Sequence, residues 1–188
     1  MGLDMYLTRK KFVGAEYEHR NVKGEINISI NGKDLPINFN KVSYIEESVG
    51  YWRKANQIHK WFVDNCQNGK DNCEEHYVSI EKLEELLNIC KQVKEKAILK
   101  DGQIENGYSY QNGVKIPSII EGKVIENQEE IEELLPTQSG FFFGGTGYDE
   151  YYMQDIENTI EILEQIIKEE KALNNNGIYC DYYYQSSW

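Results

Sequence analysis

The sequence predicts an α+β fold with a mainly antiparallel sheet and about three to four helices packed on one face. Two apolar alternations flank Asn31-Gly32, several longer segments carry apolar side chains three and four residues apart, and an aromatic run occupies residues 178–188. The chain has 188 residues, no internal repeat and no linker that would divide it. We therefore expect a single domain over residues 1–188.

The first strand is expected at residues 3–8, where apolar and more polar side chains alternate. Residues 9–23 are basic and irregular, so we interpret them as a connection. Alternating runs on both sides of Asn31-Gly32 then predict a β-hairpin with a type I′ turn, because both central residues of that turn need positive φ. The apolar positions of the two runs are Ile26, Ile28, Ile30, Leu35, Ile37 and Phe39.

Helical spacing is expected from about Ser48 to Val63, where two stripes lie side by side. The stripes consist of Tyr51, Ala55, Ile58 and Phe62, and of Trp52, Asn56, His59 and Val63. This helix would place Asn56 and His59 on the border of its apolar face.

A polar loop is expected at residues 64–77, followed by a second helix that Ser79 caps. Val78 and Leu83 are spaced as a hydrophobic staple at the start of this helix. Its core face is expected to comprise Leu83, Leu86, Leu87, Cys90, Val93 and Ala97.

Residues 98–126 carry glycines between short apolar pieces, and we interpret them as a peripheral hairpin or a mobile insertion. Asn127 and Glu130 then resemble a capping box at the start of a short helix, which Pro136 closes. A long amphipathic helix follows and stops at the Asn-Asn-Asn-Gly of residues 174–177. Its apolar positions are Tyr152, Ile156, Thr159, Ile160, Leu163, Ile166 and Ile167. The aromatic residues after it predict a final strand.

The most distinctive stretch is LLPTQSGFFFGGTGYDEYY at residues 134–152. Three phenylalanines at 141–143 followed by Gly-Gly-Thr-Gly predict a buried strand, a tight glycine turn and a helix start. Glycines let another group approach the main chain closely, so this corner can hold an anionic ligand against backbone N–H groups, or it can be only a tight turn. Asp149 and Glu150 would compete there with a bound phosphate.

The candidate ligand-binding residues combine that corner with the helix expected at Ser48–Val63. Arg53 can bind phosphate or carboxylate, Asn56 a base edge or ribose hydroxyl, and Trp52 or Tyr148 can stack on a planar ring. The full set is Trp52, Arg53, Asn56, His59, Phe143, Gly144, Gly145, Thr146 and Tyr148. The alternative is that Arg53 is solvated and that local partners satisfy Asn56 and His59.

No metal, cofactor or catalytic residue is predicted. His59, Cys66, Cys73 and His76 have zinc-competent side chains, but their spacings match no common zinc module. No nucleophile motif surrounds a cysteine, and no carboxylate lies in a motif that marks a general acid. An enzymatic activity therefore has no support in the sequence.

The composition limits which partners and which cellular compartment are expected. The formal charge of -12 argues against direct nucleic-acid binding, since that affinity comes largely from Lys and Arg contacts to phosphate. Residues 126–171 hold thirteen Asp and Glu against Lys168 and Lys171, which indicates either a solvated helical face or a surface that docks on a basic protein.

The four cysteines are too scattered for a disulfide framework, so a reducing cytoplasm is expected. Neither a secretory signal nor an apolar run of the roughly 18 residues needed to cross a bilayer is present, and no membrane contact is expected.

Several motifs together resemble a family of small uncharacterised proteins carried mainly by bacteriophages and prophages. They are MGLDMYL, YWRKANQIHKWFV, DNC with YVS, LLPTQSGFFFGGTGYDEYY and YYQSSW, and they extend over nearly the whole chain. In that family the position of Cys66 is not typically Cys and that of His76 is typically Tyr, while the segment 98–126 is particular to this chain. The resemblance implies a phage setting, in the cytoplasm of a bacterial host, and no established activity.

Our leading hypothesis is a phage accessory protein that binds and sequesters a small nucleotide-type ligand, such as a host-defence signal. One alternative is an inhibitor that binds a host defence protein or nuclease through the acidic helical face. Another is an enzyme that processes a nucleotide. We also expect a homo-oligomer, because Tyr and Trp on a terminal strand can add to a neighbour's sheet edge.

Overall fold

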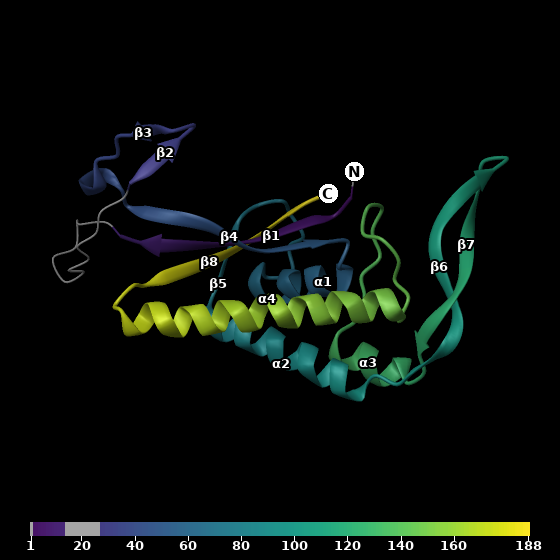
Figure 1. Cartoon of the computed structure of the whole chain (residues 1–188). Coiled ribbons are helices and arrows are strands. Elements are labelled where there is room, and N and C mark those ends of the chain that lie inside the picture. The colour runs from purple at the N-terminus through teal and green to yellow at the C-terminus, as the bar shows by residue number, and fades with distance from the viewer. Residues whose placement is uncertain (1, 14–26) are drawn as a thin grey trace.

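The computed structural model describes residues 2–13 and 27–188, and it confirms the α+β class. Its central feature is a four-stranded sheet in the order β4-β1-β8-β5, in which every pair of neighbours is antiparallel (Figure 1). The strands are β1 (Asp4–Phe12), β4 (Tyr44–Arg53), β5 (His76–Val78) and β8 (Cys180–Ser187).

The helices lie on one side of this sheet (Figure 1). α1 and α4 contact the sheet, α2 packs along α4, and the short α3 packs against α2. Side chains alternate along the strands, so that Met5 and Leu7 on β1 and Tyr182 and Tyr184 on β8 are buried toward the helices. The helices are α1 (Asn56–Cys66), α2 (Ile80–Lys96), α3 (Gln128–Leu134) and α4 (Glu150–Asn175).

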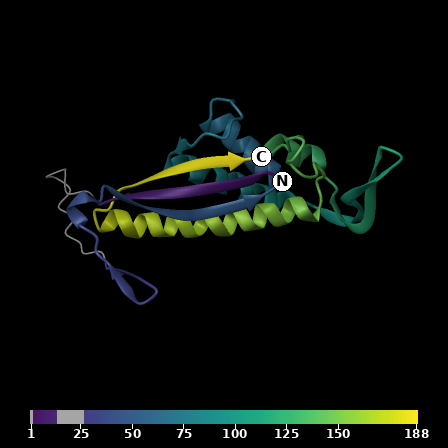
Figure 2. The same ribbon diagram turned by 90° about the horizontal axis from the view of Figure 1, so that it is seen from above.

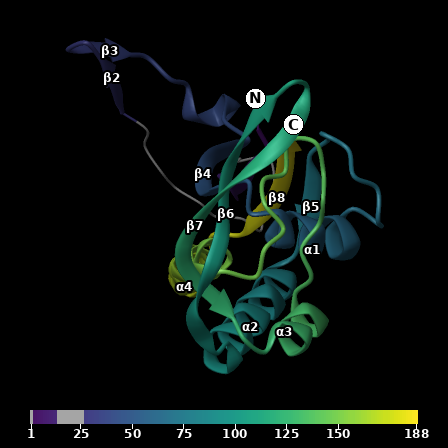
Figure 3. The ribbon, with the colours of Figure 1, turned by 90° about the vertical axis from the view of Figure 1, so that its right-hand side faces the viewer.

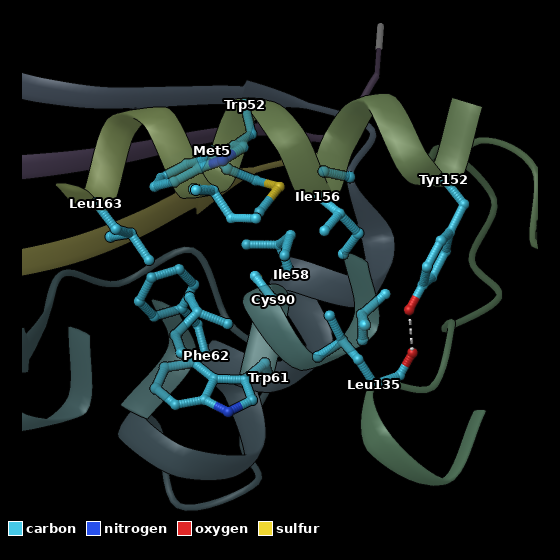
Figure 4. Packing of buried hydrophobic residues seen from close by; sticks show 14 of the residues in the cluster. Met5, Trp52, Ile58, Trp61, Phe62, Cys90, Leu135, Tyr152, Ile156 and Leu163 are labelled. Carbon is cyan, nitrogen blue, oxygen red and sulfur yellow. Dashed lines mark hydrogen bonds between the residues drawn. The ribbon is translucent and has the colours of Figure 1, made fainter. Parts of the chain in front are cut away.

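The hydrophobic core fills the space between the sheet and the helices, as Figure 4 shows. Phe62 stacks on Tyr184 with the ring centroids 4.0 Å apart. Tyr152 donates a hydrogen bond of 2.8 Å to the carbonyl of Leu135, which ties α4 to the residue that follows α3. Complete burial of a phenylalanine side chain such as that of Phe62 contributes about 1.5–3 kcal/mol to the free energy of folding.

Two helix starts follow from local chemistry. The Ser79 hydroxyl accepts a hydrogen bond from the amide of Lys82, so the predicted cap of α2 is confirmed. Asp149 caps α4. At α3, Asn127 does not cap the helix through its side chain but donates to Glu130 and to the carbonyl of Lys96. The expected apolar positions of α4 are all buried.

The helix expected from Ser48 to Val63 is wrong in its first half. Residues up to Arg53 belong to β4, which pairs with β1, and α1 begins only at Asn56. Trp52 faces the helices and Tyr51 faces away, which is the period of two that a strand requires. Aromatic side chains favour strands, and pairing with β1 outweighs the helical spacing that these positions also have.

The hairpin at Asn31-Gly32 is confirmed, with φ of 51° and 73° at its two turn residues. Its strands, β2 (Ile28–Ile30) and β3 (Lys33–Leu35), are short, and Phe39 lies in a 3-10 turn. Ile26 and most of the connection expected at 9–23 lie outside the described residues. The rest of that connection belongs to β1, which continues to Phe12.

Residues 98–126 form a long hairpin of β6 (Leu99–Gln111) and β7 (Val114–Ile125). In Figure 1 its outer part stands apart from the sheet and the helices, while its base lies beside α4, and in Figure 3 its two strands lie in front of the rest of the protein. Its tip is a second turn with positive φ, at Asn112 and Gly113.

The buried strand expected at residues 141–143 is also wrong. These residues form a turn in which Phe141 is 92 % exposed and Phe143 is 5 % exposed. No strand of the described residues pairs with this segment, and Gly144 reverses the chain with a φ of 88°. The helix expected after the glycines begins at Glu150.

The final strand, β8, is confirmed, and it lies inside the sheet between β1 and β5. β1 pairs with it from Asp4 to Lys11, and β5 pairs with Tyr182 to Tyr184 on its other side. The strand that suggested self-association is therefore not a sheet edge, and the homo-oligomer stays a prediction.

Candidate functional site

A cavity of about 260 Å³ lies beside the glycine-rich corner. The end of β4, the start of α1, the loop at residues 137–147, the first turns of α4 and one residue of β6 meet around it. Its lining consists of Arg53, Lys54, Gln57, Glu105, Thr137, Gly145, Gly147, Asp149, Tyr151, Tyr152, Gln154 and Asp155. We refer to it as the Arg53–Asp155 cavity.

Two cationic side chains lie at this cavity. Arg53 ends β4, its side chain is 59 % exposed, and its only ion pair among the described residues is a long one of 3.8 Å with Asp4. Lys54 forms no ion pair with the described residues, and its φ of 62° is in the left-handed region that a lysine seldom adopts. This backbone turn directs the chain from β4 into α1. Both cations are thus available for an anionic group.

Gly144 packs directly against that strained turn. Its φ is 88°, and a Cβ atom built there would lie 3.1 Å from Cβ of Lys54. Glycine is therefore required for both the backbone conformation and the close approach. Gly145, the next residue, has neither restriction, since nothing lies within 4 Å of its Cβ position.

The opposite wall of the cavity is acidic. Burial raises the pKa of Asp155 to about 6, although the amide of Gln57 donates a hydrogen bond of 3.1 Å to this carboxylate. Burial also raises the pKa of Asp149, against the effect of the backbone amides that it accepts from. Glu105 from β6 adds a third carboxyl group to the lining.

The N-terminus of α4 is already occupied by the chain itself. One carboxylate oxygen of Asp149 accepts hydrogen bonds from the amides of Tyr151 and Tyr152, at 2.9 and 3.1 Å. The anion site expected at these backbone N–H groups is therefore filled by Asp149, because a capping carboxylate satisfies the donors that a phosphate would need.

Asn56 fastens the wall of the cavity instead of facing into it. Its amide nitrogen donates to the carbonyl of Gly145 at 2.6 Å and to that of Phe143 at 3.2 Å. Its oxygen accepts from the amide of Gln138 at 3.0 Å. With both donors and the acceptor used, Asn56 positions the loop and has little capacity left for a ligand.

His59 belongs to a separate buried network. Its Nδ1 lies 2.7 Å from the hydroxyl of Tyr184, and its Nε2 lies 3.1 Å from the carboxylate of Asp71. Burial lowers the pKa of His59, and the Asp71 carboxylate raises it in opposition. The neutral ring satisfies both contacts when Tyr184 donates to Nδ1 and Nε2–H donates to Asp71. Asp71 also accepts from the indole N–H of Trp188 at 3.2 Å.

The other predicted site residues support the loop or the core. Trp52 is buried, and its indole N–H donates to the Thr159 hydroxyl at 2.9 Å, so it does not reach the cavity. The rings of Phe143 and His59 lie nearly perpendicular to each other, with their centroids 5.0 Å apart. The Tyr148 hydroxyl accepts from the amide of Thr137, whose own hydroxyl donates to the carbonyl of Thr146.

Of the nine predicted residues, Arg53 and Gly145 therefore line the cavity, and Gly144 packs against Lys54 behind it. Sequence reasoning missed Lys54, Gln57, Tyr151 and Asp155. Only Asp155 carried a signal, because a carboxylate stands there within the apolar stripe formed by Tyr152, Ile156 and Thr159. The others became neighbours only through tertiary packing.

The zinc-competent residues do not gather into a site. Among residues 2–13 and 27–188, no group of three or more His, Cys, Asp and Glu is placed to hold a metal ion. His76 contacts the Asn72 side chain, and burial raises the pKa of the Cys66 thiol to about 11. No helix in this part of the chain is long and apolar enough to span a membrane.

Comparison of the chain with protein-family models, with curated proteins and with solved structures finds no match. A function must therefore be argued from the geometry of the cavity and from the residues around it.

Proposed function

We propose that the protein binds a small nucleotide-type ligand in the Arg53–Asp155 cavity and sequesters it. The observation that carries the proposal is the placement of two cations, Arg53 and Lys54, in the same cavity as a half-buried carboxyl group, Asp155. A nucleotide has matching parts, since its phosphate is anionic and the edge of its base offers N–H donors.

The chemistry of the lining supports a ligand with its phosphate at the two cations and its base at Asp155. Arg53 and Lys54 would bind the phosphate, and Arg53 can do so with two parallel hydrogen bonds. The Asp155 carboxylate accepts hydrogen bonds from the amino or imino groups of a base, and the Gln57 amide can add a donor or an acceptor beside it. Tyr151, which is 39 % exposed in the lining, is placed to stack on a planar ring.

Binding is favoured over turnover because the lining holds no nucleophile paired with a base. Its hydroxyl groups belong to Thr137, Tyr151 and Tyr152, and within the described residues none of them is hydrogen-bonded to a histidine or a lysine. The enzyme alternative relies on Asp155 as a proton acceptor. Recovery of the bound ligand unchanged would separate sequestration from processing.

The phage resemblance supplies the biological part of the proposal. A phage protein that binds a nucleotide without consuming it lowers the free concentration of that nucleotide in the host. Sequestration of a host-defence signal follows from this setting. The cytoplasm of the bacterial host is the matching compartment.

The acidic-face alternative gains no specific support. Of the thirteen acidic residues at 126–171, five form ion pairs with lysine or arginine from other segments. The pairs are Glu126–Lys100, Glu130–Lys96, Glu157–Lys94, Glu164–Lys91 and Glu169–Arg9. Such exposed pairs contribute little stability, but they neutralise part of the charge that a basic partner would need.

The test begins with the protein purified from cells, denatured, and analysed by mass spectrometry for a released small molecule. Arg53→Ala and Lys54→Gln should lose the ligand. Lys60→Ala, which alters a partly exposed cation of α1 outside the cavity, should retain it.

A nucleotide panel then measures binding by thermal shift and calorimetry. A ligand at a hundred times its dissociation constant adds about 2.7 kcal/mol of stability, so a real ligand is easily seen. A protein that carries no nucleotide and that no nucleotide in the panel stabilises would show the proposal to be wrong.

A further inference from the structure

The face of the sheet opposite the helices is rich in tyrosine. Strand alternation places one or more tyrosines of each strand on this side, and Tyr6, Tyr44, Tyr51 and Tyr77 are 38 to 55 % exposed. Tyr183 on β8 lies among them and is half-buried. We call this surface the tyrosine face, defined by Tyr6, Tyr44, Tyr51, Tyr77 and Tyr183.

In the described part of the chain, no helix covers this face. The view in Figure 2 shows β8, β1 and β4 side by side with no helix in front of them. An antiparallel sheet with one solvated face usually carries polar side chains there. Clustered exposed aromatic side chains instead mark an interaction surface, because they bury much area on binding and lose little conformational entropy.

The charge of the tyrosine face indicates its partner. Asp4, Glu46, Glu75 and Asp181 are acidic neighbours of the tyrosines, and Lys10 and Arg53 are the basic ones. The face is therefore net negative, as is the whole chain. A phosphate backbone would be repelled, and a second copy of this chain would present the same negative face.

The face also contains an example of the interaction that a basic partner would make. The ammonium group of Lys10 lies 4.0 Å from the ring centroid of Tyr183 and 5.5 Å from that of Tyr44. Glu75 accepts a hydrogen bond of 2.7 Å from the same ammonium group. A cation is thus held at once by aromatic rings and by a carboxylate. Tyr51 and Asp4, which are joined by a hydrogen bond, offer a second ring beside a second carboxylate.

We propose that the tyrosine face is a docking surface for a basic protein partner, which places arginine or lysine side chains over the tyrosine rings and beside the carboxylates. This surface lies on the other side of the sheet from the helices and shares only Arg53, at its edge, with the Arg53–Asp155 cavity. The proposal does not depend on what that cavity binds.

A peptide of nine arginines is a defined probe of this chemistry, and a peptide of nine citrullines, which has nearly the same shape without the charge, is its control. Titration of the ¹⁵N-labelled full chain with the arginine peptide should shift the amide signals of β1, β4 and β8 around the tyrosines. The citrulline peptide should shift none of them. The double variant Tyr51→Ser with Tyr77→Ser should lower the affinity about tenfold.

Two matched variants control for general charge and for loss of any tyrosine. Tyr110→Ser removes an exposed tyrosine from the β6–β7 hairpin, and Glu161→Gln removes an exposed carboxylate from α4. Both should bind the arginine peptide as the parent does. Circular dichroism and a thermal melt establish that the double variant is folded.

Several outcomes would overturn the proposal. They are shifts that map to α4 instead of the sheet, equal affinity of the double variant and the parent, or the same shifts produced by a single-stranded RNA oligomer. A mass that doubles with concentration for the parent but not for the double variant would assign the face to self-association instead.

Discussion

Asn56 on α1 donates a hydrogen bond of 2.6 Å to the carbonyl of Gly145, which lies 89 residues further along the chain. This contact joins the two most distinctive motifs of the sequence, since Asn56 belongs to the first and Gly145 to the second. It also fixes one wall of the Arg53–Asp155 cavity. The shape of the cavity therefore depends on a residue that does not line it.

Asn56→Ala should destabilise the protein by about 2–3 kcal/mol, because it leaves two carbonyl groups and the amide of Gln138 without their partner in a buried or half-buried setting. Urea denaturation measures the loss. Asn65→Ala, at an exposed position on the same helix, should change the free energy of unfolding by less than about 0.5 kcal/mol. Equal effects of the two changes would contradict the positioning role of Asn56.

Gly144→Ala and Gly145→Ala form a matched pair in the glycine turn. Gly144→Ala should cost about 1–3 kcal/mol, because alanine is strained at a φ of 88° and its Cβ would press on Lys54. Gly145→Ala should be close to neutral, since its backbone is unrestricted and the space beside it is open. Thermal melts of both variants give the comparison. A reversed order would mean that the turn is not held against Lys54 as described.

Asp155→Asn should remove a pH dependence of stability. Burial raises the pKa of Asp155 from 3.8 to about 6, so the folded state binds this proton more tightly than the unfolded state does. The resulting stability is fully present below about pH 3.8 and is lost as the pH rises through about 6. Asparagine keeps a neutral partner for Gln57, so the variant should exceed the parent by about 1–2 kcal/mol above pH 6 and equal it near pH 4.

Melting temperatures between pH 4 and 8 test this expectation. Asp64→Asn alters an exposed carboxylate of α1 and should give a curve parallel to that of the parent. A constant difference between Asp155→Asn and the parent over the whole range would show that Asp155 does not titrate differently in the folded state.

The outer part of the β6–β7 hairpin should be dispensable for folding. Glu105 and Ile119 are paired across the hairpin, so residues 106–118 can be replaced by Asn-Gly without a change of register. Because a two-stranded hairpin is marginally stable by itself, we expect a loss of about 1 kcal/mol or less and retained ligand binding, with Glu105 still in place. Chemical denaturation and the nucleotide panel measure the two properties. Loss of cooperative unfolding would mean that the tip supports the core.

Gly122→Ala, at the base of the same hairpin, is the contrasting change. A Cβ atom there would lie 2.5 Å from Cδ1 of Ile104, which is buried. We expect a clear destabilisation of about 1–3 kcal/mol, because the close packing at the base leaves no room for a methyl group. A neutral outcome would mean that the strands separate there without cost.

Local patterns in the sequence were sufficient to predict α2, α4, β8 and the hairpin at Asn31-Gly32. In each case the signal is a short-range one, such as the cap at Ser79 or the pair of residues that tolerate positive φ. These preferences act over a few residues and do not require the rest of the chain. The α+β class follows from the same elements.

Where a segment fits two patterns, only the tertiary structure determines which secondary structure forms. Tyr51 and Trp52 satisfy a helical stripe and a strand alternation equally well, and pairing with β1 selects the strand. The turn at Lys54, the partial burial of Asp155 and the approach of Gly144 to Lys54 likewise depend on residues far apart in sequence. The cations Arg53 and Lys54, the Gln57 amide and the Asp155 carboxyl group meet in the cavity because the helices pack against one side of the sheet. No local spacing in the sequence indicates that arrangement.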